Sequence, residues 1–175
     1  MQSVMRIVAT VLAAGIVVAC ATGAERWADD PVPDGTRLSL HETVPVSTYT
    51  RRAHIQGGAA VDPGRIDRFT PHCYIRVRDT EVRAVEPGEF EVGGYRTRRE
   101  VAGSGMGMPL LVAGTLQERG SGHSRNEARV GLYSADQPHV HEMICAYDST
   151  VRRAPHLGFA DIRDVLEGVG TLARP

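Results

Sequence analysis

Hydrophobic and polar residues alternate through short segments of the chain beyond residue 36. In segment 73–78, every second residue from Cys73 is apolar, while Tyr74 and arginines occupy the other face. Segments of this period bounded by Gly, Pro and Asp are typical of half-buried β-strands. The predicted strands are residues 37–40, 48–56, 73–78, 81–85, 89–101, 110–116, 128–134 and 140–147.

Apolar residues take a helical spacing once, near the end of the chain. Ile162, Val165, Leu166 and Val169 fall at intervals of three and four, so we expect one amphipathic helix that covers one face of a sheet. About eight short strands and one C-terminal helix predict a mainly β (α+β) fold, either an antiparallel sandwich or a partly open barrel. A chain of 175 residues suits a single core, so residues 37–175 are expected to form one domain.

Two segments leave this pattern unsettled. Gly93-Gly94 interrupts the predicted strand 89–101 and is either a hairpin turn or a bulge, because glycine adopts positive φ without strain. Residues 117–127 are polar throughout and are predicted to be disordered.

The first 19 residues are typical of a targeting segment. Arg6 precedes an apolar run over residues 7–18, and Met5 is an alternative start. A helix over that run would be about 18 Å long, short of the bilayer's apolar core at about 30 Å. We therefore expect a signal peptide over residues 1–19 and, because Pro and Gly follow, a tether over residues 20–36.

The segment Val17-Val18-Ala19-Cys20 resembles the lipobox of bacterial lipoproteins. The resemblance implies that Cys20 is the lipid attachment site: its thiol carries diacylglycerol, cleavage occurs before it, and its new amino group is acylated, with palmitate as a typical acyl chain. Two or three such chains would hold the protein firmly at the membrane. Ala21, in place of an aspartate after the cysteine, implies retention at the outer membrane, facing the periplasm.

An ordinary secretory signal is the alternative interpretation of this terminus. Small residues allow cleavage after Ala21 or Ala24, and Cys20 would then be discarded.

The remainder of the chain has a looser resemblance to a group of small proteobacterial envelope lipoproteins without an assigned activity. The resemblance is carried by residues 54–58 (HIQGG), 66–69 (IDRF), 71–73 (PHC) and 87–92 (PGEFEV), with a second cysteine at Cys145 and a terminal helix. It implies the architecture and the two-cysteine pattern but no catalytic residue. We therefore expect a non-enzymatic structural or binding role, with the membrane as a partner through the lipid and an envelope protein as a further candidate partner.

Two cysteines remain after Cys20. Cys73 and Cys145 both fall in predicted strands, and a signal that directs export places them where disulfides persist. One bridge between sheets or neighbouring strands is the simplest expectation, and two reduced buried thiols are the alternative. A redox or metal role is not expected, because the chain has no C-x-x-C spacing.

Composition narrows the chemistry further. All 20 basic residues are arginines, balanced by 21 acids, so mechanisms that need lysine are excluded. A near-neutral charge and 5% aromatic residues argue against a nucleic-acid partner. Three arginine pairs could meet phosphates of lipid or lipopolysaccharide, although we interpret them as a solvated surface: Arg51-Arg52, Arg98-Arg99 and Arg152-Arg153.

Histidines provide the alternative function, a periplasmic metal-binding protein. His139 and His141 share one face of a predicted strand and could hold Zn or Cu, and Met106 with Met108 would suit Cu(I). One H-x-H motif supplies two of the three or four ligands required, so we expect no metal and no other cofactor. Ser104 lies outside any G-x-S-x-G motif, so we do not expect a hydrolase.

Overall fold

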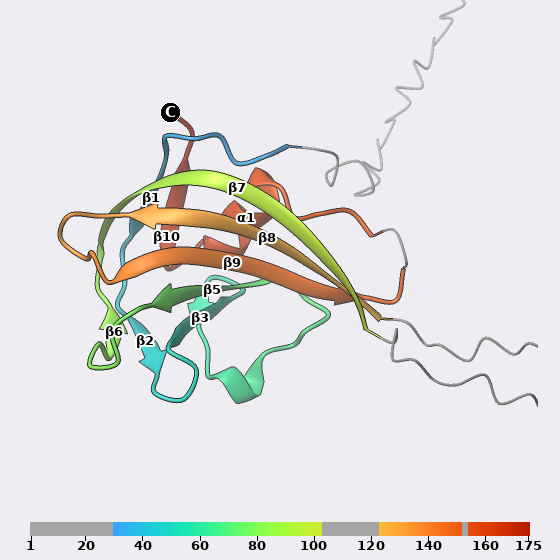
Figure 1. Cartoon of the computed structure of the whole chain (residues 1–175), viewed down its shortest axis with the longest axis horizontal. Helices are drawn as coiled ribbons and strands as arrows, with labels where there is room; N and C mark the ends of the chain where they lie inside the picture. The colour runs from blue at the N-terminus through green and yellow to red at the C-terminus, as the bar shows by residue number, and fades with distance from the viewer. Residues whose placement is uncertain (1–29, 103–122, 152–153) are drawn as a thin grey trace, which may run out of the picture.

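The computed structural model describes residues 30–102, 123–151 and 154–175. A ten-stranded antiparallel sheet curls into a half-barrel, and one helix lies against its concave side (Figure 1). The strands are β1 (Thr36–Leu40), β2 (Val44–Ser47), β3 (Arg52–Gln56), β4 (Ala59–Ala60), β5 (His72–Val77), β6 (Ala84–Val85), β7 (Gly88–Ala102), β8 (His123–Tyr133), β9 (Val140–Ser149) and β10 (Gly170–Ala173). Their order is β10-β1-β7-β8-β9-β5-β3-β2-β6, with β4 paired to β3. The mainly β class is confirmed, as a single curled sheet and not as a sandwich.

Three long strands, β7, β8 and β9, form the middle of the sheet (Figure 1). In β7, Gly93 pairs with Gly131 of β8, and the register shifts before Arg96 pairs with Arg129. Gly94 has φ 65° within this shift. The Gly93-Gly94 segment is therefore a bulge inside one continuous strand, because β7 pairs with β8 on both sides of it.

The hydrophobic core fills the concave side of the sheet. Helix α1 (Phe159–Leu166) buries the face that carries Phe159, Ile162, Val165 and Leu166, as its spacing predicts. Val169 is also buried, but it lies beyond the helix in the turn before β10. Fully buried side chains from the strands belong to the same core cluster as this helix face: Leu38, Ile75, Phe90, Leu132 and Met143.

A close backbone approach fixes the end of α1. The amide of Gly58 donates to the carbonyl of Val165 at 3.0 Å. A Cβ on Gly58 would lie 1.7 Å from the carbonyl oxygen of Glu167, and Gly58 has φ 74°. Only glycine fits here, and the turn between β3 and β4 therefore docks directly on the C-terminal end of the helix.

A disulfide joins Cys73 to Cys145 on the concave side. The two cysteines are register partners on the neighbouring strands β5 and β9, and both are buried. The predicted bridge between neighbouring strands is therefore present, and it links residues 72 apart in the sequence.

Several predicted boundaries are wrong. The predicted strand 48–56 is interrupted, because residues 48–51 form the turn between β2 and β3, and Arg51 has φ 53°. Residues 123–127 belong to β8 and not to a disordered segment, and Glu127 and Asn126 accept hydrogen bonds there from Arg125 and Arg99. Alternation did not reveal β2 or β10, and the predicted strand 110–116 lies outside the described residues.

The last part of the predicted tether packs on the domain. Val32 is buried, and the amide of Phe159 donates to the carbonyl of Asp30 at 2.8 Å. Arg174 forms a salt bridge with the carboxylate of Asp30. Residues 30–36 are therefore part of the folded unit, whereas Cys20 lies outside the described residues. In the part of the chain that is described, no helix has the length and apolar character needed to cross a membrane.

Candidate anion-binding site

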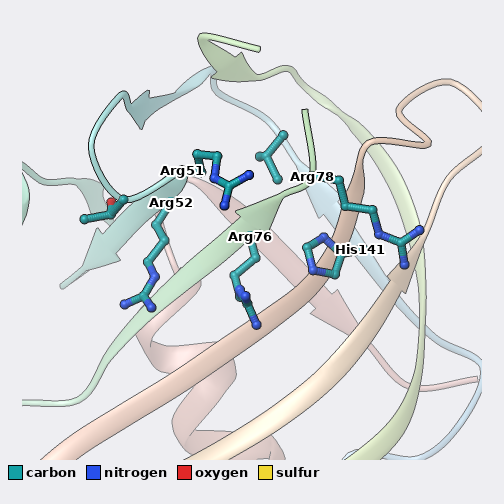
Figure 2. A pocket seen from close by; sticks show the side chains of 7 residues that line it. Arg51, Arg52, Arg76, Arg78 and His141 are labelled. Atoms are coloured by element: carbon teal, nitrogen blue, oxygen red, sulfur yellow. The ribbon is translucent and has the colours of Figure 1, made fainter. Parts of the chain in front are cut away.

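A hollow of about 380 Å³ opens on the outer side of the sheet, where β5 ends and β9 begins (Figure 2). We call it the arginine pocket, and it is lined by Thr50, Arg51, Arg52, Arg76, Val77, Arg78 and His141. Four arginines and one histidine from three separate stretches of the chain thus line a single hollow.

Strand register brings these residues together. Arg52 of β3 pairs with Arg76 of β5, on the face opposite to the buried cysteine. Arg76 then pairs with Glu142 of β9, but Val77 pairs with Val140, so His141 is an extra residue without a partner across the ladder. Such an irregularity redirects a side chain, and here it turns His141 toward the arginines.

Arg51 adopts a backbone conformation that arginine rarely takes. It is the one non-glycine residue with positive φ in the described ranges, and its φ is 53°. Its amide donates to the carbonyl of Ser47 at 2.8 Å, and its carbonyl accepts from the amide of Val77 at 3.2 Å. This conformation costs about 1–2 kcal/mol and persists where surrounding contacts impose it, often at functional sites. The turn therefore holds Arg51 at the pocket's edge.

The arginine pocket has an excess of positive charge. None of its described lining residues is acidic. Arg76 reaches Glu142 at 3.0 Å, and Arg52 lies over the ring of Tyr74 at 4.4 Å. Within the described ranges, Arg51 and Arg78 have no ion-pair partner. Because opposite charges attract, an anion in this space would be stabilised most by the arginines that have no carboxylate partner.

His141 is held neutral at physiological pH. Burial, and then the charges of Arg78 and Arg76, lower its pKa below the ordinary value of 6.5, although Glu142 and a hydrogen bond with the His139 backbone act in the opposite direction. A neutral imidazole beside arginines can donate a hydrogen bond to an anion, and it can also take up a proton when an anion arrives.

This environment is unfavourable for a metal ion at His139 and His141. A divalent cation at His141 would meet the charges of Arg76 and Arg78, and the carbonyl of His139 accepts a hydrogen bond from the Arg78 amide at 2.9 Å. Across residues 30–102, 123–151 and 154–175, no group of three or more His, Cys, Asp or Glu residues is arranged to hold a metal ion. The arrangement around His141 therefore favours an anion over a cation.

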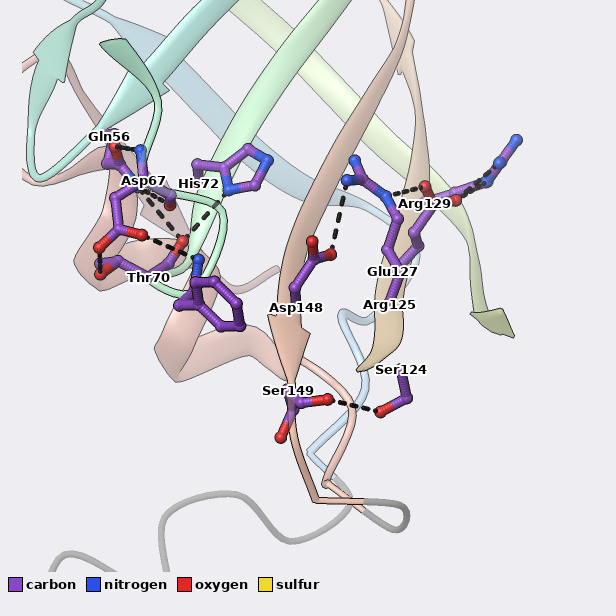
Figure 3. Close-up of polar contacts among 11 residues, drawn as sticks. Gln56, Asp67, Thr70, His72, Ser124, Arg125, Glu127, Arg129, Asp148 and Ser149 are labelled. Atoms are coloured by element: carbon purple, nitrogen blue, oxygen red, sulfur yellow. Dashed lines mark hydrogen bonds and ion pairs between the residues drawn. The ribbon is translucent and has the colours of Figure 1, made fainter. Parts of the chain in front are cut away.

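A second charged cluster on the same face has the opposite character (Figure 3). Glu127 accepts hydrogen bonds from Arg125 at 2.9 Å and Arg129 at 2.7 Å. Burial opposes ionisation of Glu127, but these bonds from Arg129 and Arg125 hold its pKa below the ordinary value. Asp148 lies 3.7 Å from Arg125. Every arginine of this cluster has a carboxylate partner, whereas in the arginine pocket only Arg76 has one among the described residues.

The predicted arginine pairs have different outcomes. Arg51 and Arg52 both line the pocket, but Arg98 and Arg99 point to opposite faces because they are neighbours in a strand. Arg98 pairs with Glu100 at 2.9 Å, whereas Arg99 donates to the Asn126 side chain at 2.9 Å and to the carbonyl of Ala154. The third pair, Arg152-Arg153, lies outside the described residues, as do Ser104, Met106 and Met108.

Sequence reasoning missed Arg76 and Arg78 as members of the site. Both lie on the polar face of the predicted strand 73–78, and that alternation was the available signal. The sequence does not reveal the strand order and register that place β5 between β3 and β9, and the site could not be predicted without them.

Comparisons of the chain with protein-family models, with curated proteins and with solved structures found no match. The assignment of a function therefore depends on the chemistry of the residues described above.

Proposed function

We propose that this chain is a non-enzymatic lipoprotein of the bacterial envelope whose domain binds an anionic ligand in the arginine pocket. The observation that supports this most directly is the convergence of four arginines and His141 on one hollow with no acidic residue among its described lining. Guanidinium groups offer paired N–H donors that match the oxygens of phosphate and carboxylate.

The residue types support binding as the role of this pocket. An arginine remains protonated at any physiological pH, so it attracts and orients an anion without exchanging a proton. The strained turn at Arg51 and the bulge at His141 keep two of the groups in position before a ligand arrives. Such preorganisation reduces the entropy lost on binding.

The geometry is compatible with attachment through Cys20 at the outer membrane. Segment 30–35 runs past the end of the domain that carries the C-terminus, whereas the β2–β3 turn with Arg51 lies at the opposite end (Figure 1). At most about 35 Å of extended chain separates Cys20 from Asp30. A domain attached in this way would present the arginine pocket away from its own membrane, toward the periplasm.

Binding is tested by calorimetry with glycerol 3-phosphate as the probe. We expect the double variant Arg51→Ala/Arg78→Ala to bind at least about tenfold more weakly than the wild type, which corresponds to about 1.4 kcal/mol. The matched control is Arg98→Ala, an exposed arginine that is paired with Glu100 outside the pocket. No binding by the wild type, or an equal loss in the control, would contradict the proposal.

Anchoring is tested separately by metabolic labelling with palmitate. We expect Cys20→Ser to abolish both the label and the cleavage that depends on lipid attachment. Cys73 is kept in this variant and serves as the internal reference cysteine. A labelled or normally processed Cys20→Ser protein would contradict the anchor and leave the anion-binding proposal intact.

A further inference from the structure

An exposed tyrosine lies beside the arginine pocket. Tyr133 ends β8 and is 64% exposed. A Cβ on Gly131 would lie 2.9 Å from the tyrosine hydroxyl oxygen and 3.2 Å from two ring carbons. A Cβ on Gly93, the register partner of Gly131, would lie 3.8 Å from the same ring. The hydroxyl end of the ring therefore lies close to backbone where two strands carry no side chains, and most of the side chain is exposed.

Tyr133 borders two hollows that share residues with the arginine pocket. One hollow on the outer side is lined by Tyr133 together with Arg76, Arg96, Arg129, His141 and the acidic Glu142. Another is lined by Tyr133 together with Arg78, His141 and the acidic Glu91. Arg76, Arg78 and His141 also line the arginine pocket, so the three hollows adjoin one another, and we call them together the groove.

The two ends of this groove differ in charge. At the pocket end, Arg51 and Arg78 have no carboxylate partner among the described residues. At the tyrosine end, Arg129 is paired with Glu127 at 2.7 Å and Arg76 with Glu142 at 3.0 Å. The pocket end thus offers positive charge that no carboxylate balances. The tyrosine end offers an aromatic side chain surrounded by positively and negatively charged hydrogen-bonding groups.

We infer that the ligand is a phosphorylated saccharide, with its phosphate in the arginine pocket and its sugar ring on Tyr133. This inference rests on the proposed function. A phosphate needs concentrated positive charge, which the pocket supplies. A sugar ring has an apolar C–H face that packs on an aromatic ring and hydroxyl groups that need donors and acceptors around its edge, which the tyrosine end supplies.

The inference is tested with glucosamine 1-phosphate and inorganic phosphate as paired probes. We expect the wild type to bind the sugar phosphate at least about tenfold more tightly than inorganic phosphate. Tyr133→Ala should reduce this preference to less than about threefold, and Tyr133→Phe, which keeps the ring, should retain it. Phe69→Ala is the matched control, because Phe69 is exposed, at 56%, and lines none of the three hollows.

The outcomes separate the two proposals. If both probes bind equally, or if Tyr133→Ala keeps the full preference for the sugar phosphate, the saccharide inference is wrong and anion binding stands. If neither probe binds, both proposals are wrong. Unfolding curves for each variant show whether the fold is retained, and a Tyr133→Ala protein that unfolds like the wild type but loses the preference separates ligand stacking from a purely structural role of the ring over the glycine pair.

Competition identifies the source of the phosphorylated sugar. Micelles of lipopolysaccharide that displace glucosamine 1-phosphate assign the ligand to a lipid headgroup, and micelles that do not displace it assign the ligand to a soluble sugar phosphate. A single-stranded oligonucleotide that binds more tightly than either saccharide would overturn the inference.

Discussion

The concave and convex faces of the sheet are made by the same strands and have opposite chemistry. In β5, Cys73 and Ile75 point into the core around α1, whereas Tyr74 and Arg76 point outward. The concave face buries apolar side chains and a disulfide. The convex face gathers arginines above a few buried residues such as Ile144. The core and the proposed ligand site thus lie on opposite sides of one layer, and changes on each side should have different effects.

The disulfide is expected to give the largest effect. Removing it in Cys73→Ala/Cys145→Ala should lower the free energy of unfolding by about 4 kcal/mol, because the unfolded chain loses a cross-link that closes a long loop. Urea unfolding measures this loss. On the convex face, the matched double variant Arg98→Ala/Glu100→Ala should lose less than about 1 kcal/mol, since that salt bridge is exposed. Equal losses of unfolding free energy in the two double variants would contradict the expected difference in stability between the concave and convex faces.

Two isoleucines of neighbouring strands compare the faces directly. Ile75 is 0% exposed on the concave side and Ile144 is 2% exposed on the convex side. We expect Ile75→Ala to destabilise the protein by about 4 kcal/mol, because the surrounding core cannot collapse into the cavity. Ile144→Ala should lose about 2 kcal/mol, because arginine stems above it can move inward. Thermal or urea unfolding of both variants gives the difference, and identical losses would show that the convex face is packed as tightly as the core.

A buried histidine on the convex face should make stability depend on pH. His54 is 6% exposed, and neither ring nitrogen has a hydrogen-bond partner among the described residues. Burial, with smaller contributions from Arg52 and His72, lowers its pKa from 6.5 to about 4, although Asp62 opposes the shift. The unfolded chain therefore binds the proton first, and about 2 kcal/mol of stability present above pH 6.5 should be lost as the pH falls toward 4.

The matched variant is His54→Leu, which cannot take up this proton. We expect its stability at pH 7 to equal or exceed that of the wild type, because an unsatisfied polar ring is replaced by an apolar side chain. Its loss of stability between pH 7 and pH 4 should be smaller than that of the wild type. Parallel pH profiles for the two proteins would assign the acid sensitivity to other groups. One such group is His72, whose pKa is also lowered mainly by burial.

The smallest predicted effect concerns His141 and the ligand. Its pKa is lowered by burial and by Arg78 and Arg76, and a bound anion would offset the charge of those arginines. Binding should then take up a proton, so affinity for sulfate, whose charge is constant in this range, should rise about threefold from pH 7.5 to pH 5.5. Calorimetry measures this change. His141→Gln should bind sulfate with a flat pH profile, and a wild-type profile equally flat would contradict the coupling.

The concave face could be predicted from the sequence more fully than the convex face. Alternation placed Cys73 in the core, and helical spacing identified the buried face of α1. Both signals are local, since each depends on residues within one element. Burial of Ser124 and Asn126 was missed because their environment is supplied by distant partners, Arg99 among them.

The arginine pocket could not be predicted because it depends on register. Arg51-Arg52 was visible as a pair, but the same pattern at Arg98-Arg99 splits across the sheet. Arg76 and His141 join the site only because β5 lies between β3 and β9 and because β9 has an extra residue at the bulge. The near-neutral net charge of the whole chain does not indicate this local excess of positive charge, which arises only when the sheet folds.

The covalent link between β5 and β9 also bears on when the pocket becomes competent. The same two strands supply Arg76 and His141, and Cys73 lies three residues before Arg76 on β5. In a thiol-reducing cytosol the newly made polypeptide would hold these strands together by noncovalent contacts alone. Under the proposed export, oxidation would lock their alignment, and the proposed binding surface would then mature only outside the cytosol.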